Sequence, residues 1–414
     1  MMMIRLLPLW FQCSLLHPNF IDSSFLRWVR LLLTPINVYL TLTIGVEYCF
    51  LPFTRRGMRN LGLGIWTFHF AAKSLEWGIT GGFWDGKYWT VPNSSSSSQT
   101  GSVPSLLTKE NHWSGVAKWT TAQFFSLRGL QYGWGPRKIL QRPSIQPLIR
   151  RLFLVNLIQA ASIAFLVIAR DQGSPTLALA ALGVPNFWAR NILAEGIATL
   201  SFGLFLLSSL DVTISILFVI CHAIHGVAKL VNIPRWILNV CDPIYCQPIY
   251  GSLHTATSLS WFWGKGWHQL FRRSFLMCGA FPASTLAKIF GGGLAIQKIC
   301  GLFGSFFVSA LMHEYAIHVA ARKPHPHPHI YFTEFPAAFL YFLAQPIGII
   351  LEPYIIPLIP RFMGGGRLWV LVFTLITATP FRIQYSEKLR NIDDAYRPVI
   401  EWTWWDVLIP GRLT

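Results

Sequence analysis

The sequence has few charged residues. Only 12% of its 414 residues are charged, whereas 53% are hydrophobic. Soluble domains carry charge on about a quarter of their residues, so this chain lacks the polar side chains that would cover a water-facing surface. The apolar residues instead fall into runs of about 20, the length of helix that crosses roughly 30 Å of hydrocarbon. The composition therefore predicts an integral membrane protein.

Cysteine is also scarce and shows no pattern. The seven cysteines are odd in number and include no CxxC pair. Several lie in apolar runs, where cysteine behaves as a small hydrophobic residue. We therefore predict neither a disulfide framework nor a zinc site. The N-terminus also lacks a small-residue cleavage pattern, so no cleaved signal peptide is predicted.

Acidic residues number only 17 against 34 basic ones, which gives a formal net charge of +17. The basic residues stand between the apolar runs, as Arg150-Arg151 and Arg272-Arg273 do. This placement is typical of loops beside a membrane, close to anionic lipid head groups. It argues against a nucleic-acid partner and for the lipid bilayer.

Nine apolar runs are candidate membrane spans. An alternating barrel pattern is missing, and backbone groups inside a membrane must be hydrogen-bonded, so the runs are expected to be helices. We predict an all-α polytopic bundle of about eight or nine transmembrane or re-entrant helices. The runs are 30–51, 60–80, 152–169, 192–210, 212–232, 276–297, 299–321, 330–351 and 367–382.

Two of these runs are weak, and a polar stretch divides the chain. Run 60–80 contains Lys73 and Glu76, and run 276–297 contains a triple-glycine break. Each is expected to be re-entrant or to lie inside the bundle. The serine-rich stretch 92–111 predicts a loop that separates N-terminal spans (1–110) from a core (111–414). Asn93 begins an Asn-Ser-Ser glycosylation acceptor, usable if this loop faces the lumen.

Run 299–321 carries His313 beside Glu314, about fourteen residues into the run. Ionisable residues inside a membrane are costly, so they are candidates for function. The alternative is a helix–helix hydrogen bond. A zincin-type metal site is excluded because His318 stands at i+5, which turns the two rings about 140° apart on a helix. A Ser309–His313 nucleophile pair stays open, although serine in a span is more often a packing residue.

The stretch 261–275 predicts an amphipathic helix at the membrane surface. Read as a helix, it divides into a polar stripe and an aromatic stripe. A surface anchor explains most of this pattern, but not a histidine within the basic stripe. Cations beside aromatic rings suit a ligand with phosphates and a flat base, such as coenzyme A. The predicted ligand contacts are Lys265, Arg272, Arg273, Trp263 and Trp267, with His268 in the polar stripe.

Three segments resemble the membrane-bound O-acyltransferase superfamily, in its wax-synthase-like branch that includes fungal terpenoid acetyltransferases. They are Ser126–Gly129 with Trp134-Gly135, Phe262–His268 with its trailing arginines, and Phe307–Glu314. The resemblance covers roughly residues 120–400. By motif, the family's membrane-embedded catalytic histidine maps to His313, and its second polar position maps to His268.

The resemblance implies an acyl-CoA-dependent O-acyltransferase with no bound cofactor, in the endoplasmic reticulum membrane. His313 would act as general base and His268 would orient the acceptor or stabilise the oxyanion. An acetyl group on a terpenoid or other lipophilic secondary metabolite is favoured, and fatty-acyl transfer to a fatty alcohol is the alternative. A transporter would show repeated halves, and a prenyltransferase would show paired Asp-rich motifs. Neither feature is present.

Overall fold

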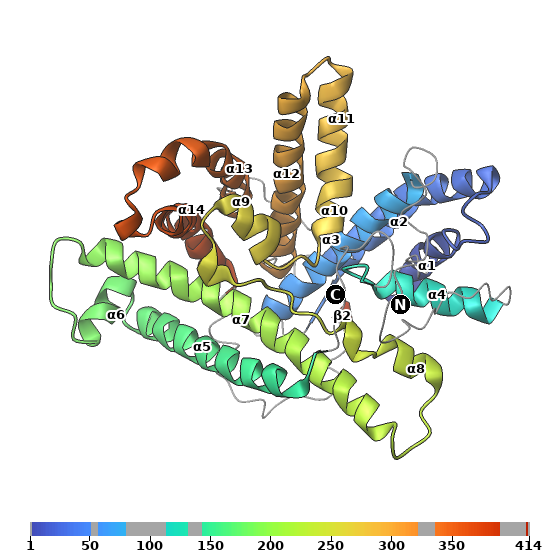
Figure 1. Cartoon of the computed structure of the whole chain (residues 1–414), viewed down its shortest axis with the longest axis horizontal. Helices are drawn as coiled ribbons and strands as arrows, with labels where there is room; N and C mark the ends of the chain where they lie inside the picture. The colour runs from blue at the N-terminus through green and yellow to red at the C-terminus, as the bar shows by residue number, and fades with distance from the viewer. Residues whose placement is uncertain are drawn as a thin grey trace.

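The computed structural model describes residues 2–50, 57–79, 113–130, 143–321, 336–389 and 411–412. Within them the chain is almost entirely helical, so the predicted all-α bundle is confirmed (Figure 1). A two-residue strand pairing, β1 (Tyr48–Cys49) with β2 (Gly411–Arg412), is the remaining regular structure in these ranges. The α-helices are α1 (Leu7–Ser14), α2 (Ser24–Glu47), α3 (Gly57–Ile79), α4 (Trp113–Phe125), α5 (Ile145–Asp171), α6 (Pro175–Ala181), α7 (Arg190–Val227), α8 (Arg235–Val240), α9 (Leu259–Trp261), α10 (Arg272–Phe275), α11 (Phe281–Ile289), α12 (Leu294–Ala321), α13 (Ala337–Ile355) and α14 (Gly366–Leu389).

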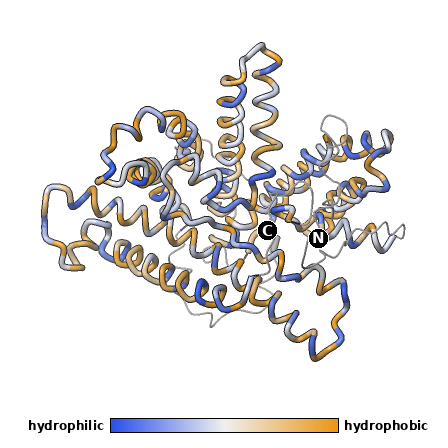
Figure 2. Tube along the Cα trace, in the orientation of Figure 1, coloured by the Kyte–Doolittle hydropathy of each residue, from blue (hydrophilic) through white to orange (hydrophobic). Residues whose placement is uncertain are grey.

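Six helices in the described part of the chain are long and apolar enough to cross a membrane: α2, α5, α7, α12, α13 with the turn that follows it, and α14. Figure 2 shows hydrophobic residues along most of the length of these helices. Many large apolar side chains on them are exposed, including Leu157 on α5 and Ile216 on α7. An exposed apolar helix surface suits contact with lipid. The predicted integral membrane character is therefore confirmed.

The predicted runs 192–210 and 212–232 form one helix and not two. Helix α7 has 38 residues, so it is about 57 Å long. The sequence suggested a boundary at Asp211, but this residue stays inside the helix and is buried. Its two carboxylate oxygens accept hydrogen bonds from Arg151 of α5 at 2.9 and 3.1 Å. Because the ion pair neutralises its charge, Asp211 does not interrupt the helix.

The two weak runs do not appear among the six candidate spans. Run 276–297 divides at its glycines: α11 ends at Ile289 and α12 begins at Leu294. Gly291 takes a positive φ of 75°, which a tight reversal between helices requires. The two helices lie side by side as a hairpin in Figure 1. Run 60–80 becomes α3, which packs between α2 and α12 and so lies inside the bundle.

Helix α3 can hold a lysine in its buried face because a neighbouring helix ends beside it. Lys73 is 4% exposed. Its ammonium donates hydrogen bonds to the carbonyl oxygens of Phe124 and Ser126, both at 2.8 Å, where α4 ends. The last carbonyls of a helix have no partners within the helix and carry partial negative charge. Lys73 therefore closes the end of α4 and joins it to α3.

The largest buried cluster surrounds α12, where it meets α7, α13 and α14. Some of its aromatic rings pack edge to face and others are stacked. The rings of Tyr341 and Phe381, for example, stack with centroids 5.4 Å apart. Rigid aromatic packing of this kind fixes the relative positions of the helices. The buried aromatic residues of this cluster are Phe202, Phe205, Phe306, Tyr341, Phe342, Phe381 and Tyr385.

Close helix approach at α12 gives a first test of the fold. A Cβ added at Gly304 of α12 would overlap the carbonyl oxygen of Gly279, whereas one added at Gly203 of α7 would meet nothing within 4 Å. We expect Gly304→Ala to lower the stability of the detergent-solubilised protein by about 1–3 kcal/mol. Gly203→Ala is the matched control and should leave the melting temperature unchanged or raise it. Equal melting temperatures for the two variants would contradict this packing.

Candidate active site

His313 lies on α12 with its imidazole stacked on Phe342 of α13, their ring centroids 4.0 Å apart. Its Nδ1 lies 2.7 Å from the carbonyl oxygen of Ser309, one turn earlier in the helix. A carbonyl oxygen can only accept a hydrogen bond, so this contact assigns the proton to Nδ1. Nε2 of the neutral ring then keeps its lone pair. The bonded atom is the main-chain carbonyl and not the serine hydroxyl, so the contact gives no support to a serine nucleophile.

His268 lies in the non-helical stretch just before α10. Its ring is surrounded by Tyr250, Trp267 and Phe271, with centroids 5.5–6.0 Å away. Burial and, to a smaller extent, the neighbouring His313 lower the pKa of His268 from 6.5 to about 3. His268 is therefore neutral at pH 7, and it lies close enough to His313 for a charge on one ring to affect the other. Its Nδ1 is buried without a hydrogen-bond partner in the described part of the chain.

The chain from Leu259 to Phe275, which we call the His268 segment, is not one continuous helix. It begins as the single turn α9, continues as a π-helical turn over Phe262–Gly266 and becomes extended at Trp267. Two glycines, at 264 and 266, weaken a helix here. Gln269 holds the broken end, because its side-chain amide donates to the carbonyls of Trp263 at 3.1 Å and Trp267 at 2.7 Å.

This break corrects the predicted amphipathic helix near 261–275 and changes its predicted stripes. Lys265 and Arg272 are exposed, whereas His268 is half-buried among aromatic rings. Arg273 forms an ion pair with Glu76 of α3, its Nε 2.7 Å from the carboxylate. The π turn and the extended residue rotate the side chains out of the register that an α-helix would give. Phosphate binding by these three cations stays a prediction.

The predicted aromatic contacts Trp263 and Trp267 do lie beside the two histidines. Trp263 packs edge to face against Phe342, centroids 6.0 Å apart, and so shares with His313 the same α13 side chain. Trp267 lies 5.5 Å from the ring of His268. The structure thus brings together His313, His268 and both tryptophans. Their roles toward a ligand stay predictions.

The first of the three motifs reaches the same region through Arg128. One of its terminal nitrogens donates to the carbonyl oxygen of Gln247 at 2.8 Å. This contact supports the stretch that carries Tyr250, a neighbour of His268. Trp134, Gly135 and the predicted glycosylation site Asn93 lie outside the described residues.

Sequence reasoning missed two residues of α13 that hold the His268 segment. Gln345 accepts a hydrogen bond from the Trp263 indole at 3.0 Å and is fully buried. The carboxylate of Glu352 accepts hydrogen bonds from the main-chain N–H groups of Leu259 and Ser260, where α9 begins. Carboxylates are favourable at helix N-termini. Both are polar residues in or beside an apolar run, so the argument that singled out His313 could have found them.

Comparison with known proteins points to the same stretch of the chain. Residues 246–336, which include His268 and His313, match the model described as the membrane bound O-acyl transferase family. The chain is 32% identical to Acetyltransferase pyr8 of Aspergillus fumigatus over 77 residues, 19% of this chain and 18% of that protein. The resemblance predicted from the motifs is therefore confirmed.

Two further relatives carry similar names. Over 167 residues the chain is 27% identical to Acetyltransferase ataH of Aspergillus terreus, covering 37% of this chain and 52% of that protein. Over 66 residues it is 35% identical to Acetyltransferase aurG of Calcarisporium arbuscula, 16% of each protein. The chain thus spans about half the length of one of these three relatives and less than a fifth of the others. No solved structure matches the chain.

The low pKa of His268 predicts how stability changes with pH. The folded protein keeps this ring neutral down to a pH of about 3, whereas the unfolded chain binds a proton below about 6.5. Acidification therefore favours unfolding, by about 2 kcal/mol from this residue at pH 5. We expect the melting temperature of the wild-type protein to fall more between pH 7 and pH 5 than that of His268→Gln. The exposed His254 gives the control variant His254→Gln, and equal falls for wild type and His268→Gln would contradict a buried neutral His268.

Proposed function

We propose that this chain, which resembles the membrane-bound O-acyltransferases, transfers an acetyl group from acetyl-CoA to the hydroxyl of a lipophilic alcohol. The observation that carries the proposal is the hydrogen-bonded state of His313. Its Nδ1 is occupied by the Ser309 carbonyl, so Nε2 is left as a proton acceptor inside the family-matched segment. A neutral imidazole with a free nitrogen is the group that base catalysis of acyl transfer requires.

The reaction needs a proton to move from the alcohol to the leaving thiolate. His313 Nε2 takes the hydroxyl proton as the alcohol oxygen attacks the thioester carbonyl and forms the new C–O bond. The tetrahedral intermediate then collapses, the C–S bond breaks, and the imidazolium returns the proton to the sulfur of coenzyme A. The Nδ1 hydrogen bond holds the ring in one orientation and stabilises the imidazolium as it forms. The products are the acetate ester and free coenzyme A.

His268 is proposed to stabilise the negative charge on the carbonyl oxygen. A neutral histidine carries one N–H that can donate to the developing oxyanion. Its low pKa supports this role, because the ring stays neutral at pH 7. His268 is also neutral when His313 becomes charged, so the two rings do not repel each other at that step.

Acyl-CoA is proposed to lie along the exposed side of the His268 segment. Lys265 and Arg272 are exposed there and offer positive charge to phosphates. The alcohol is proposed to come from the lipid bilayer, since α12 and its neighbours expose apolar surface. Residence in the endoplasmic reticulum membrane is part of the same proposal. The names of the relatives, all acetyltransferases, favour acetyl over a longer acyl group.

Membranes that contain the protein give a direct test. We expect them to convert radiolabelled acetyl-CoA and an alcohol from a panel of terpenoids into an ester, with palmitoyl-CoA a poorer donor. His313→Ala should lower the rate by at least about a hundredfold at equal protein levels, because general-base catalysis contributes roughly 100- to 10,000-fold. His254→Ala, at an exposed position, is the control. Near-normal transfer by His313→Ala would overturn the mechanism, and preference for palmitoyl-CoA would favour the fatty-acyl alternative.

A further inference from the structure

His268 has no secondary structure of its own to hold it beside α12. Residues 267–271 form neither helix nor strand. The position of the ring therefore depends on what anchors the His268 segment on either side. On the N-terminal side, the anchors are the contacts of Gln345 and Glu352 from α13 described above. On the C-terminal side, the anchors come from α3.

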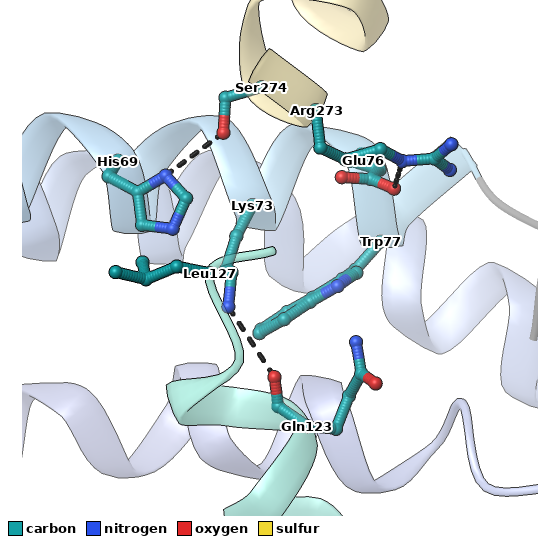
Figure 3. A pocket seen from close by; sticks show the side chains of 8 residues that line it. All are labelled: His69, Lys73, Glu76, Trp77, Gln123, Leu127, Arg273 and Ser274. Carbon is teal, nitrogen blue, oxygen red and sulfur yellow. Dashed lines mark hydrogen bonds and ion pairs between the residues drawn. The ribbon is translucent and has the colours of Figure 1, made fainter. Parts of the chain in front are cut away.

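Figure 3 shows the C-terminal anchors, which are two consecutive residues of α10 bound to α3. Arg273 Nε donates to Glu76 at 2.7 Å, and the two side chains are only 15% and 4% exposed. The Ser274 hydroxyl lies 2.9 Å from Nδ1 of His69, which is 2% exposed. The ring of His69 also packs edge to face on Phe271, centroids 5.1 Å apart. Phe271 in turn touches His268.

A buried ion pair of this kind fixes a position strongly even where it adds little net stability. Removing one partner takes the directly bonded counter-charge away from the other buried group, which costs several kcal/mol. The chain would relieve that cost by pulling Arg273 or Glu76 toward water. Because Arg273 is only five residues beyond His268, such a movement carries the histidine with it. A misplacement of about 1 Å at a reacting group can cost about a hundredfold in rate.

We propose that Glu76, acting through Arg273, is a positioning residue that sets His268 beside His313. This inference rests on the proposed function for its effect on catalysis, but not for its effect on the position of His268. It gives the buried Arg273 a role distinct from phosphate binding and leaves the exposed Lys265 and Arg272 for coenzyme A. Helix α3 thereby takes part in the site, although it carries none of the three motifs.

Kinetics of purified protein separate positioning from phosphate binding. We expect Glu76→Gln and Arg273→Gln each to lower kcat about tenfold or more, with the KM for acetyl-CoA changed less than about twofold. The double variant should be no worse than either single one, because both remove the same interaction. The conservative variant Arg273→Lys should recover part of the loss. Arg272→Gln is the neighbouring control and should raise the KM while leaving kcat unchanged.

A second control removes another buried ion pair, which joins α5 to α7 and not to the His268 segment. Asp211→Asn breaks the contact with Arg151 on α5, so it should lower the melting temperature without changing kcat of the folded fraction. A raised KM for acetyl-CoA in Arg273→Gln, with normal kinetics in Glu76→Gln, would overturn the proposal in favour of phosphate binding. A normal kcat in both Glu76→Gln and Arg273→Gln would also overturn the proposal, because the ion pair would then be only a structural contact.

An activity-free measurement distinguishes failure of this inference from failure of the proposed function. Carbethoxylation of histidine by diethylpyrocarbonate, followed by mass spectrometry of the peptide that contains His268, reports how accessible the ring is. We expect the rate at His268 to rise at least about fivefold in Glu76→Gln and Arg273→Gln and to stay at the wild-type level in Arg272→Gln and Asp211→Asn. An unchanged rate in the first two variants overturns the positioning role. A raised rate in a protein without acyl transfer supports that role and overturns the proposed function.

Discussion

The hydrogen bond between His313 Nδ1 and the Ser309 carbonyl is the interaction on which the proposed chemistry depends. An imidazole inside a membrane helix needs a partner for its N–H, and the nearest acceptor is the carbonyl one turn earlier. Once that bond forms, Nε2 of the neutral ring keeps its lone pair. The same contact therefore satisfies the buried donor and fixes the tautomer. Phe342, stacked on the ring, restricts its rotation.

The second histidine is placed by contacts between segments far apart in the sequence. Glu352 and Gln345 of α13 bind the start of the His268 segment, and Glu76 of α3 binds its end. The carboxylates of Glu352 and Glu76 lie in or beside apolar runs, and each accepts hydrogen bonds from N–H groups of this segment. The α12 helix lies between α3 and α13. Two helices that lack the sequence motifs thus hold the motif residues against the helix that carries His313.

Part of this arrangement could be predicted from the sequence. Apolar run length predicts a membrane bundle because it depends on composition alone, and His313 is conspicuous because it interrupts such a run. Run length and composition could not predict that the amphipathic stretch 261–275 is broken. Its periodicity is compatible with a helix, but the start of the segment is held by Gln345 and Glu352 of α13, which lie more than 80 residues away in the sequence. The side chain of Gln269 then bonds the carbonyls at the broken end. The predicted helix boundary at Asp211 was wrong for a similar reason, since its partner Arg151 lies 60 residues away in the sequence. Ion pairs between distant residues leave no local pattern.

The mechanism can be tested by a structure of the protein with a non-hydrolysable acetyl-CoA analogue, in which a methylene group between the sulfur and the carbonyl turns the thioester into a thioether and a ketone. We expect the sulfur and the nearby carbonyl of the analogue to lie between His313 Nε2 and His268. We also expect His313 Nδ1 to face the Ser309 carbonyl still, and the phosphates to lie near Lys265 and Arg272. An analogue bound with its sulfur remote from His313, or a His313 ring turned so that Nε2 is occupied by a protein donor or acceptor, would contradict the mechanism.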